Sequence, residues 1–358
     1  REAIDFCRYY AVEAENIFLA KDLPGPTGEK NIYQLKARGL TCVISPWNFP
    51  IAIFVGQLIA ALICGNVTIA KPAEQTSNLS YLIFKLLLKA GLPKNSAALI
   101  LGKGENIGPN IFSNKYLQNV VFTGSLETAK IIQKQLQERD DLTNLIAETG
   151  GLNCLIADSS ALTEHIVEDV INSAFNSAGQ RCSACRILCV EENVYEKTIS
   201  MLKGALDTLT VSSPELISTD IGPVIDQEAK EKINNHINKF NNIYQSNVVN
   251  NKGYFVNPTI IEIKKLTEVQ DEIFGPVLHV ISFKAKNLLE LCQQIDSLNY
   301  GLTLGIHSRI DKVINTVVKN TNVGNIYINR NIVGAVVGSQ PFGGHHKSGT
   351  GPKAGGPE

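Results

Sequence analysis

Short apolar runs alternate with helix-like segments through the first half of the chain, and this alternation constrains the fold more than any other feature. Strand-like runs are expected at Leu40–Ile44, Val67–Ala70, Ala97–Leu101 and Asn119–Phe122. Between the first three runs the sequence predicts helices over Ile51–Cys64 and Leu79–Ala90, the second ended by Gly91. A repeated strand–helix–strand order is typical of a parallel sheet covered by helices. We therefore expect an α/β fold.

The second half continues the alternation. A helix is expected over Glu164–Ala178, ended by Gly179, and strands are expected at Cys185–Val190, Val277–Phe283 and Gly324–Asn329. The chain has 358 residues, enough for about two domains. The change in composition near Glu148 predicts a first domain over residues 1–147, a second over 148–350 and a tail over 351–358.

Charge and cysteine content limit the classes of function. Lys and Arg number 33 and Asp and Glu 34, so the net charge of −1 gives no general attraction to nucleic acid. The longest apolar stretch, Ile51–Gly65, is shorter than the roughly 20 residues of a membrane span, so no transmembrane segment is expected. The eight cysteines sit largely in apolar runs of a chain long enough to fold without disulfides. We expect free thiols and a cytoplasmic location.

Ligands of parallel sheets bind where the strands end, which directs attention to residues 45–50, 71–76, 102–108 and 123–125. Asn48, between two prolines, could donate to an oxyanion or simply form a turn. Lys71 and Glu74 could bind ribose or phosphate. The helix that opens at Gly124 and Ser125 could bind a pyrophosphate. The glycines of residues 102–108 do not form the standard dinucleotide fingerprint, so that pattern alone predicts no dinucleotide site.

Two further residues could carry out chemistry. Cys182 follows a glycine at a helix–strand junction, and the neighbouring Arg181 would favour its thiolate. A buried structural cysteine and a Cys-x2-Cys-x3-Cys metal site are the alternatives, and we expect no metal because no histidine or fourth cysteine lies nearby. Glu148 follows the apolar run Leu145–Ala147, where a carboxylate can act as a general base or remain a surface charge.

Taken in order, these segments resemble the aldehyde dehydrogenase family. Seven motifs match: Pro46-Trp47-Asn48-Phe49-Pro50, Lys71-Pro72-Ala73-Glu74, Phe122-Thr123-Gly124-Ser125, Glu148-Thr149-Gly150-Gly151, Gly179-Gln180-Arg181-Cys182, Glu272-Ile273-Phe274-Gly275-Pro276 and Pro341-Phe342-Gly343-Gly344. Residues 1–10, 173–182, 324–331, 334–338 and 348–356 further resemble the 1-pyrroline-5-carboxylate dehydrogenase module of bifunctional proline utilization A proteins. The resemblance implies a Rossmann-like NAD-binding domain and an α/β catalytic domain.

The resemblance also implies an activity, the NAD-dependent oxidation of L-glutamate γ-semialdehyde to L-glutamate, with no FAD. Cys182 would be the nucleophile, Asn48 would stabilise the oxyanion and Glu148 would activate water. The residues implied to bind NAD are Trp47, Lys71, Glu74, Gly124, Ser125, Glu272 and Phe274. Those implied near the substrate are Arg181, Ser183, Gly334, Ala335 and Phe342.

Departures from the family pattern leave other interpretations open. Relatives have more residues before the Pro46 segment, so the chain could be a non-catalytic remnant or one piece of a split protein that needs its N-terminal part. It could also oxidise another small aldehyde. His346 replaces a usual glycine, and a positive φ there would strain the turn. Residues 24–42 resemble the family's oligomerisation hairpin, so a homo-oligomer is the expected assembly.

Overall fold

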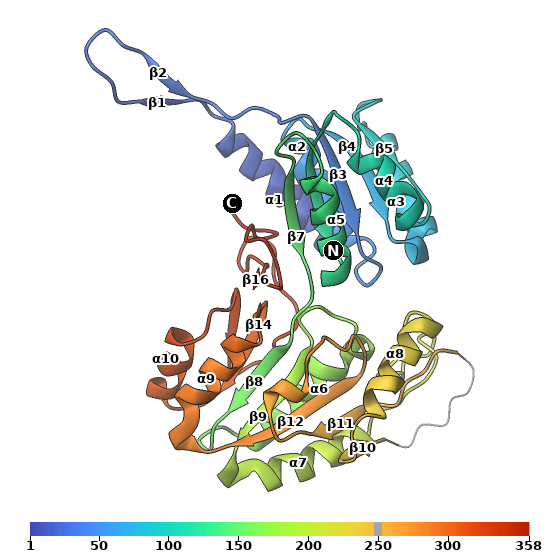
Figure 1. Ribbon diagram of the computed structural model, residues 1–358, viewed down its shortest axis with the longest axis vertical. Coiled ribbons are helices and arrows are strands. Elements are labelled where there is room, and N and C mark those ends of the chain that lie inside the picture. The colour runs from blue at the N-terminus through green and yellow to red at the C-terminus, as the bar shows by residue number, and fades with distance from the viewer. Residues whose placement is uncertain (247–252, 358) are drawn as a thin grey trace. The chain divides into compact units, whose positions relative to one another are not determined.

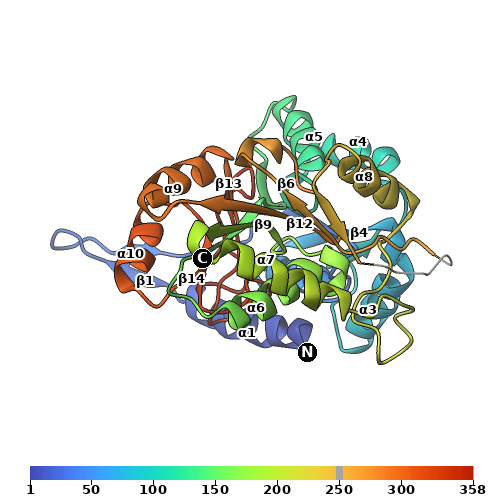
Figure 2. The ribbon, with the colours of Figure 1, turned by 90° about the horizontal axis from the view of Figure 1, so that it is seen from below.

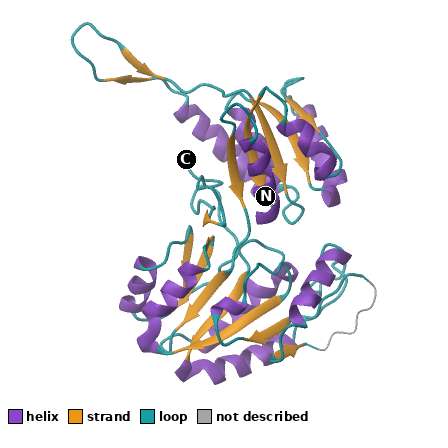
Figure 3. Cartoon of the chain, in the orientation of Figure 1, coloured by secondary structure: helices purple, strands orange, loops and turns teal. Residues whose placement is uncertain are grey.

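The computed structural model describes residues 1–246 and 253–357, which form two compact units (Figure 1). Unit 1 comprises Arg1–Thr149, Ala335–Gly343 and Thr350–Glu358, and unit 2 comprises Gly150–Gly334 and Gly344–Gly349. The mixed α/β architecture, with helices on parallel sheets in both units, confirms the expected fold class (Figure 3).

Unit 1 contains a five-stranded sheet in which every neighbouring pair is parallel. Its order is β5 (Ala97–Leu99), β4 (Val67–Pro72), β3 (Leu40–Ser45), β6 (Leu117–Thr123) and β7 (Asn144–Glu148). The helices are α1 (Glu2–Ile17), α2 (Ala52–Ile63), α3 (Ser77–Lys89), α4 (Gly104–Phe112), α5 (Leu126–Gln137) and the 3₁₀ turn η1 (Glu74–Thr76). Strands β3 to β6 and helices α2, α3 and α5 lie close to the positions that the sequence pattern predicts, whereas α1 and α4 correspond to no helix that it predicted.

The sheet of unit 1 has a core on each face. Cys42 and Val43 are consecutive in β3 and point to opposite sides, as strand geometry requires. Cys42 packs with residues of α4 and α5, whereas Val43 packs with residues of α2 and α3. Both faces are therefore covered, which explains why the central strands are largely apolar.

A hairpin of β1 (Lys21–Leu23) and β2 (Asn31–Tyr33) extends from unit 1 (Figure 1). It begins and ends earlier in the chain than the expected hairpin over residues 24–42. Its side chains are mostly exposed, including Leu23 and Ile32. A two-stranded ribbon without a hydrophobic cover has little stability of its own. Its role in oligomerisation stays a prediction.

Unit 2 contains a seven-stranded sheet, parallel except at one edge, where β10 and β11 are antiparallel. Its order is β10 (Ile243–Gln245), β11 (Thr259–Glu262), β12 (Val277–Phe283), β9 (Cys185–Glu191), β8 (Asn153–Ala157), β14 (Thr303–His307) and β15 (Asn325–Ile328). The helices are α6 (Thr163–Phe175), α7 (Glu192–Asp207), α8 (Gln227–Ile237), α9 (Leu288–Ser297) and α10 (Asp311–Lys319). Helices α6 and α7 pack on each other and on β9, and Figure 2 shows them in front of the sheet.

Short elements complete unit 2. They are the 3₁₀ turns η2 (Asn176–Gly179), η3 (Leu266–Glu268) and η4 (Ala285–Asn287), and the pair β13 (Tyr300–Gly301) and β16 (His345–His346). Helix α6 ends at Phe175 rather than at Ala178, because Ser177 and Ala178 have left-handed φ angles of 56° and 54°. His346 has a φ of 57°, so the left-handed backbone that would strain this turn is observed.

The division into units differs from the predicted domains. The chain leaves unit 1 after Thr149, close to the predicted boundary, but residues 335–343 and 350–358 return to it. Hydrogen bonds to unit 1 explain the return, because Thr350 bonds both the amide and the carbonyl of Ala147 and the Tyr10 hydroxyl accepts one from the Gly355 amide. Phe342 and Ala354 exchange two more, which pair the two returning segments with each other. Such long-range partners leave no mark in local composition.

Within the described part of the chain, no helix combines the length and the apolar character needed to cross a membrane.

Candidate active site

Unit 1 gathers many of the predicted residues at the carboxyl edge of its sheet. The chain runs from β3 to β4 and β5 on one side, then crosses to β6 and β7 on the other, so the strand order reverses between β3 and β6. Ligands of open α/β sheets bind outside the strands at such a point. Trp47 and Asn48 follow β3, and Gly124 and Ser125 follow β6.

Lys71, Glu74 and Gly104 form a small polar cluster beyond β4. The buried Lys71 Nζ lies 3.0 Å from Glu74 Oε1 and donates to the Pro72 carbonyl at 2.9 Å. The same Glu74 oxygen accepts a 2.8 Å hydrogen bond from the Gly104 amide. Burial alone would raise the pKa of Glu74, but bonds from its own backbone, Lys71 and Gly104 lower it below the usual value. Glu74 is therefore a fixed, ionised acceptor.

Gly124 and Ser125 place the N-terminus of α5 at the same edge. A Cβ on Gly124 would overlap the ring of Phe122, so the backbone passes the ring only because this residue is glycine. The Gly124 amide donates to the Glu148 carbonyl at 3.1 Å. Ser125 is the N-cap, and its Oγ accepts from the Thr128 amide at 3.1 Å. The predicted helix start is thus confirmed.

Glu148 is the last residue of β7 and packs against the segment that returns to unit 1. A Cβ on Gly343 would lie 3.0 Å from Glu148 Oε1, so a larger residue there would press on the carboxylate. The Thr350 hydroxyl accepts from the Ala147 amide at 2.9 Å, beside the base. The returning segments, through Gly343 and Thr350, therefore fix the end of β7.

Cys182 lies in unit 2, between η2 and β9, in a segment that we call the nucleophile loop (residues 177–184), which includes most of η2. The loop begins with three left-handed residues, Ser177, Ala178 and Gly179, the last with a φ of 66°. A Cβ on Gly179 would overlap the Gly275 carbonyl. The glycine therefore serves both the backbone angle and the close approach to residues 272–276, which we call the cofactor loop. Left-handed non-glycine residues are uncommon and cluster at functional sites.

Carbonyl groups of the nucleophile loop are held by side chains from neighbouring strands. Asn153, which begins β8, donates to the carbonyls of Cys182 at 2.6 Å and Ala184 at 2.9 Å. Its Oδ1 accepts from the Thr303 amide at 3.1 Å, and the Thr303 hydroxyl donates to the Ser183 carbonyl at 3.4 Å. Fixing these carbonyls fixes the peptide planes around Cys182. Sequence analysis missed Asn153, although an amide at the start of an apolar strand is a usable signal.

Arg186 holds the remaining part of this loop. Its Nη1 donates to the carbonyls of Gly179 at 2.8 Å and Gly275 at 3.2 Å. Its Nη2 donates to the carbonyl of Arg181 at 3.1 Å and to Glu272 Oε1 at 3.2 Å. Sequence analysis missed Arg186 too, although a cation inside the apolar run of β9 is unusual.

Glu272 and Phe274 surround this guanidinium. The Phe274 ring centroid lies 5.3 Å from Arg186 Cζ, a distance at which a cation and an aromatic face attract. Burial raises the pKa of Glu272, and the charge of Arg186 opposes that rise only in part. A Cβ on Gly150 would overlap the Glu272 carboxylate, so the double glycine after Glu148 makes room for this side chain.

The predicted substrate residues are divided between the units. Arg181 donates from Nε to Ser177 Oγ at 3.1 Å, which places its guanidinium over the start of the nucleophile loop. The Gly334 carbonyl accepts from the Tyr327 hydroxyl at 3.1 Å. Burial raises the pKa of Tyr327, Arg330 opposes this, and the charge of Cys182 adds to it. Tyr327, which sequence analysis did not assign, therefore holds the Gly334 carbonyl.

Two groups of predicted residues result. Unit 1 holds Trp47, Asn48, Lys71, Glu74, Gly124, Ser125, Glu148, Ala335 and Phe342, and unit 2 holds Arg181, Cys182, Ser183, Glu272, Phe274 and Gly334. The structure brings together the Lys71 and Glu74 pair in unit 1. In unit 2 it links the nucleophile loop to the cofactor loop.

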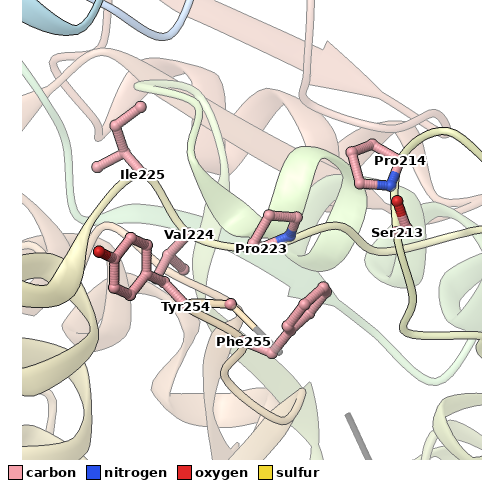
Figure 4. A pocket seen from close by; sticks show the side chains of 8 residues that line it. Ser213, Pro214, Pro223, Val224, Ile225, Tyr254 and Phe255 are labelled. Atoms are coloured by element: carbon pink, nitrogen blue, oxygen red, sulfur yellow. The ribbon is translucent and has the colours of Figure 1, made fainter. Parts of the chain in front are cut away.

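A surface pocket of unit 2 contains none of these residues. It is lined by Ser213, Pro214, Pro223, Val224, Ile225, Gly253, Tyr254 and Phe255 (Figure 4). The Gln180 side chain of the nucleophile loop does bond the backbone behind it, donating to Pro223 O at 3.2 Å and accepting from Ile225 N at 2.8 Å. The pocket wall thus supports the loop. In the described ranges, no three His, Cys, Asp or Glu side chains are grouped to hold a metal ion.

Comparisons with known proteins agree with this arrangement. The bifunctional protein PutA of Klebsiella aerogenes is 48% identical over 372 residues, which cover 100% of this chain and 27% of PutA. The 1-pyrroline-5-carboxylate dehydrogenase of Staphylococcus saprophyticus is 36% identical over 100% of this chain and 71% of its own length.

Solved structures give the same result. A crystal structure of a bifunctional proline utilization A (PutA) protein matches with a TM-score of 0.97 and 47% identity over 100% of this chain and 37% of that one. A 1-pyrroline-5-carboxylate dehydrogenase of Thermus thermophilus matches with a TM-score of 0.91 and 33% identity, covering 99% and 70%. The chain thus spans about a quarter to a third of the PutA proteins. The model of the aldehyde dehydrogenase family matches residues 1–358, and the chain belongs to that family.

Proposed function

We propose that this chain oxidises L-glutamate γ-semialdehyde, the hydrolysis product of 1-pyrroline-5-carboxylate, to L-glutamate with NAD. Membership of the aldehyde dehydrogenase family supports the reaction class. Relatives named 1-pyrroline-5-carboxylate dehydrogenase support the substrate. The observation that carries the proposal is the nucleophile loop, in which Asn153 and Arg186 hold the carbonyls on both sides of Cys182.

In this mechanism the Cys182 thiolate attacks the aldehyde carbon. A carbon–sulfur bond forms, and the carbonyl π electrons move to oxygen as an alkoxide. The Asn48 amide and the Cys182 backbone N–H stabilise that alkoxide, because fixed donors are effective where charge develops. A nicotinamide cofactor held by Glu272 and Phe274 would supply the acceptor for the hydride that leaves the same carbon, and Cys182 would then carry a thioester. Glu148 then removes a proton from water, which attacks the thioester and releases the acid and the thiolate.

The residues at the edge of unit 1 suit a dinucleotide. Lys71 and Glu74 are a cation and an acceptor for the adenosine ribose, and the N-terminus of α5 at Ser125 favours a pyrophosphate. The ionised Glu74 would repel a 2′-phosphate, which favours NAD over NADP. In unit 2, Glu272 and Phe274 are assigned to the nicotinamide ribose and ring.

The test is NADH formation from 1-pyrroline-5-carboxylate and NAD by the purified chain. Cys182→Ala should abolish turnover because no covalent intermediate forms. Glu148→Ala should retain one rapid burst of NADH and then lose about 10²–10⁴-fold in steady turnover, because only deacylation needs the base. Cys185→Ala is the matched control, because that thiol is buried in β9.

Two outcomes would overturn the proposal. Turnover that persists in Cys182→Ala would exclude the thioester route. A folded wild-type chain without turnover, even after the N-terminal part of a relative is added, would support the non-catalytic interpretation.

A further inference from the structure

Arg186 is a cation buried in the interior of a strand. Every residue of β9 is buried, and Arg186, 1% exposed, is the largest of the fully buried side chains in the described part of the chain. Burying a guanidinium is costly unless its N–H groups find partners. Here the cation and its partners join two loops that are distant in sequence.

The partners of Arg186 divide evenly between these loops. Two are carbonyls of the nucleophile loop, those of Gly179 and Arg181. Two belong to the cofactor loop, the Gly275 carbonyl and the Glu272 carboxylate. Each terminal nitrogen donates one hydrogen bond to the nucleophile loop and one to the cofactor loop. The four N–H groups on the two terminal nitrogens thereby each have an acceptor, whereas the buried Nε has none among the described residues.

The contact between the loops is tight at the same place. Gly179 approaches the Gly275 carbonyl so closely that a Cβ would not fit, and both of these residues offer their carbonyls to Arg186 Nη1. Two carbonyl dipoles that face one cation attract it more than they repel each other. Without the cation, the two carbonyls would lose their shared donor in a buried position.

We propose that Arg186 is a positioning residue that fixes the nucleophile loop against the cofactor loop. The reactivity of the Cys182 thiol then depends on the charged hydrogen bond between Glu272 and Arg186. This inference rests on the proposed function, in which Cys182 is the nucleophile and Glu272 binds the nicotinamide ribose. Arg186 acts through the backbone on both sides of Gln180 and through one carboxylate. It does not itself touch the reacting atoms.

Lysine cannot replace this geometry. Its ammonium has three donors at one point, whereas the four acceptors need two nitrogens in a fixed fork. Arg186→Lys keeps the charge but must release at least one acceptor. The variant therefore separates the effect of the forked donor geometry from the effect of the positive charge.

Arg139 supplies a matched control in unit 1. Its guanidinium is also buried, with a side chain 8% exposed, and it also donates to backbone carbonyls, including those of Asn114 and Leu117, and to one carboxylate, Asp141. None of its partners is a predicted site residue. Arg139→Lys therefore reproduces the loss of an arginine fork without disturbing either loop.

The experiment measures the alkylation rate of Cys182 by iodoacetamide without NAD, resolved from the other cysteines by peptide mass spectrometry, together with kcat and the KM for NAD. We expect Arg186→Lys to slow alkylation at least severalfold, to lower kcat on the order of 10²-fold and to raise the KM for NAD, since small misplacements have effects of that size. Arg139→Lys should stay within about twofold of wild type in all three. Unchanged alkylation and KM in folded Arg186→Lys would overturn the proposal.

A second variant keeps the test decisive if Arg186→Lys fails to fold. Glu272→Gln retains the shape of the side chain and removes only its charge. Glu272 lies outside the nucleophile loop. If the two loops were independent, Cys182 in Glu272→Gln would be alkylated at the wild-type rate in the absence of NAD, and that result would overturn the proposal. A changed rate would support it. Failure of this inference would be seen in the alkylation rate, which needs no turnover. Failure of the proposed function would be seen as turnover in Cys182→Ala, so the two failures are distinguishable.

Discussion

Glu74 and Glu272 are both assigned to a ribose of the cofactor, yet their surroundings differ. The Glu74 side chain in unit 1 is 43% exposed, and its pKa is lowered despite partial burial. The Glu272 side chain in unit 2 is 17% exposed, and burial raises its pKa despite the neighbouring Arg186. Each carboxylate has one cationic partner, but only the partner of Glu272 is also bonded to the nucleophile loop.

The difference shows that the same residue type can have two tasks. Glu74 is an accessible acceptor whose hydrogen bonds come from its own turn and the start of α4, so it can be changed with local consequences. Glu272 completes the partners of a buried guanidinium, so its loss is felt wherever that guanidinium bonds. Burial and a shared partner with the nucleophile loop thus occur together at Glu272 in unit 2, whereas Glu74 in unit 1 has neither.

The largest expected effect tests this contrast directly. Glu272→Ala leaves Arg186 buried without its carboxylate, and breaking such a pair costs about 3–5 kcal/mol in the free energy of unfolding. Glu74→Ala removes a carboxylate that is 43% exposed, and the buried Lys71 keeps its hydrogen bond to the Pro72 carbonyl, so the loss should be smaller, about 1 kcal/mol. Urea unfolding of both variants measures the two losses. Equal losses would contradict the distinction.

A smaller effect concerns the stability of the fold at acidic pH. It should arise in unit 2, which contains all six histidines of the chain. His236 and His279 are buried side chains whose Nε2 atoms lie 2.8 Å apart, and His279 Nδ1 lies 3.0 Å from the Arg186 carbonyl. Burial lowers their pKa values to about 4 and about 3 respectively. For His236, Lys239 adds to the decrease and Asp271 opposes it. For His279, the backbone bond opposes it, whereas His236 and Arg186 add to it.

The direction of the pH effect follows from proton counting. Below a pH of about 6.5 the unfolded histidines bind protons, whereas the folded pair stays neutral until about pH 4, so stability falls as pH falls through this window. Each histidine should remove about 2 kcal/mol between pH 7 and pH 5. His236→Phe should reduce the slope of unfolding free energy against pH by about one proton near pH 5.5. An unchanged slope would show that this pair is not its source.

The smallest effect is expected at His346, which lies in an exposed turn of the otherwise largely buried unit 2. His346 has a left-handed φ, and its Nε2 lies 2.9 Å from Asn322 Nδ2. Relieving the backbone strain should outweigh this exposed bond, so His346→Gly should raise the free energy of unfolding by about 0.5–1 kcal/mol. His345→Gly, at a neighbour without a positive φ, should lower it. Thermal unfolding distinguishes the two, and a loss in both would refute the role of strain.

The sequence pattern predicted the regular part of the fold well. The strand expected at Leu40–Ile44 is observed at Leu40–Ser45, and the helix expected from Ser125 begins at Leu126. Periodicity and capping are local properties, so they can be found without tertiary information. The end of α6 could not, because its left-handed residues are held by the close approach of Gly179 to Gly275, nearly a hundred residues away.

The candidate site shows the same division between motif and support. Cys182, Glu148 and Glu272 stand in motifs that a family resemblance can assign. Asn153 and Arg186 do not, because their importance lies in which carbonyls they hold, and those partners are set by the pairing of β8 and β9. A polar residue inside a strongly apolar strand is the one sequence signal that could have identified them.

The path of the chain between the two units has a consequence for its synthesis on the ribosome. The polypeptide passes from one unit to the other four times, at residues 149–150, 334–335, 343–344 and 349–350. Unit 1 therefore combines residues made before unit 2 with residues made after it, among them Gly355, whose amide donates to the Tyr10 hydroxyl. Nearly all of unit 2 emerges while the sheet of unit 1 still lacks its closing segment. Cys182 and its loop are thus expected to fold into place before unit 1 is complete.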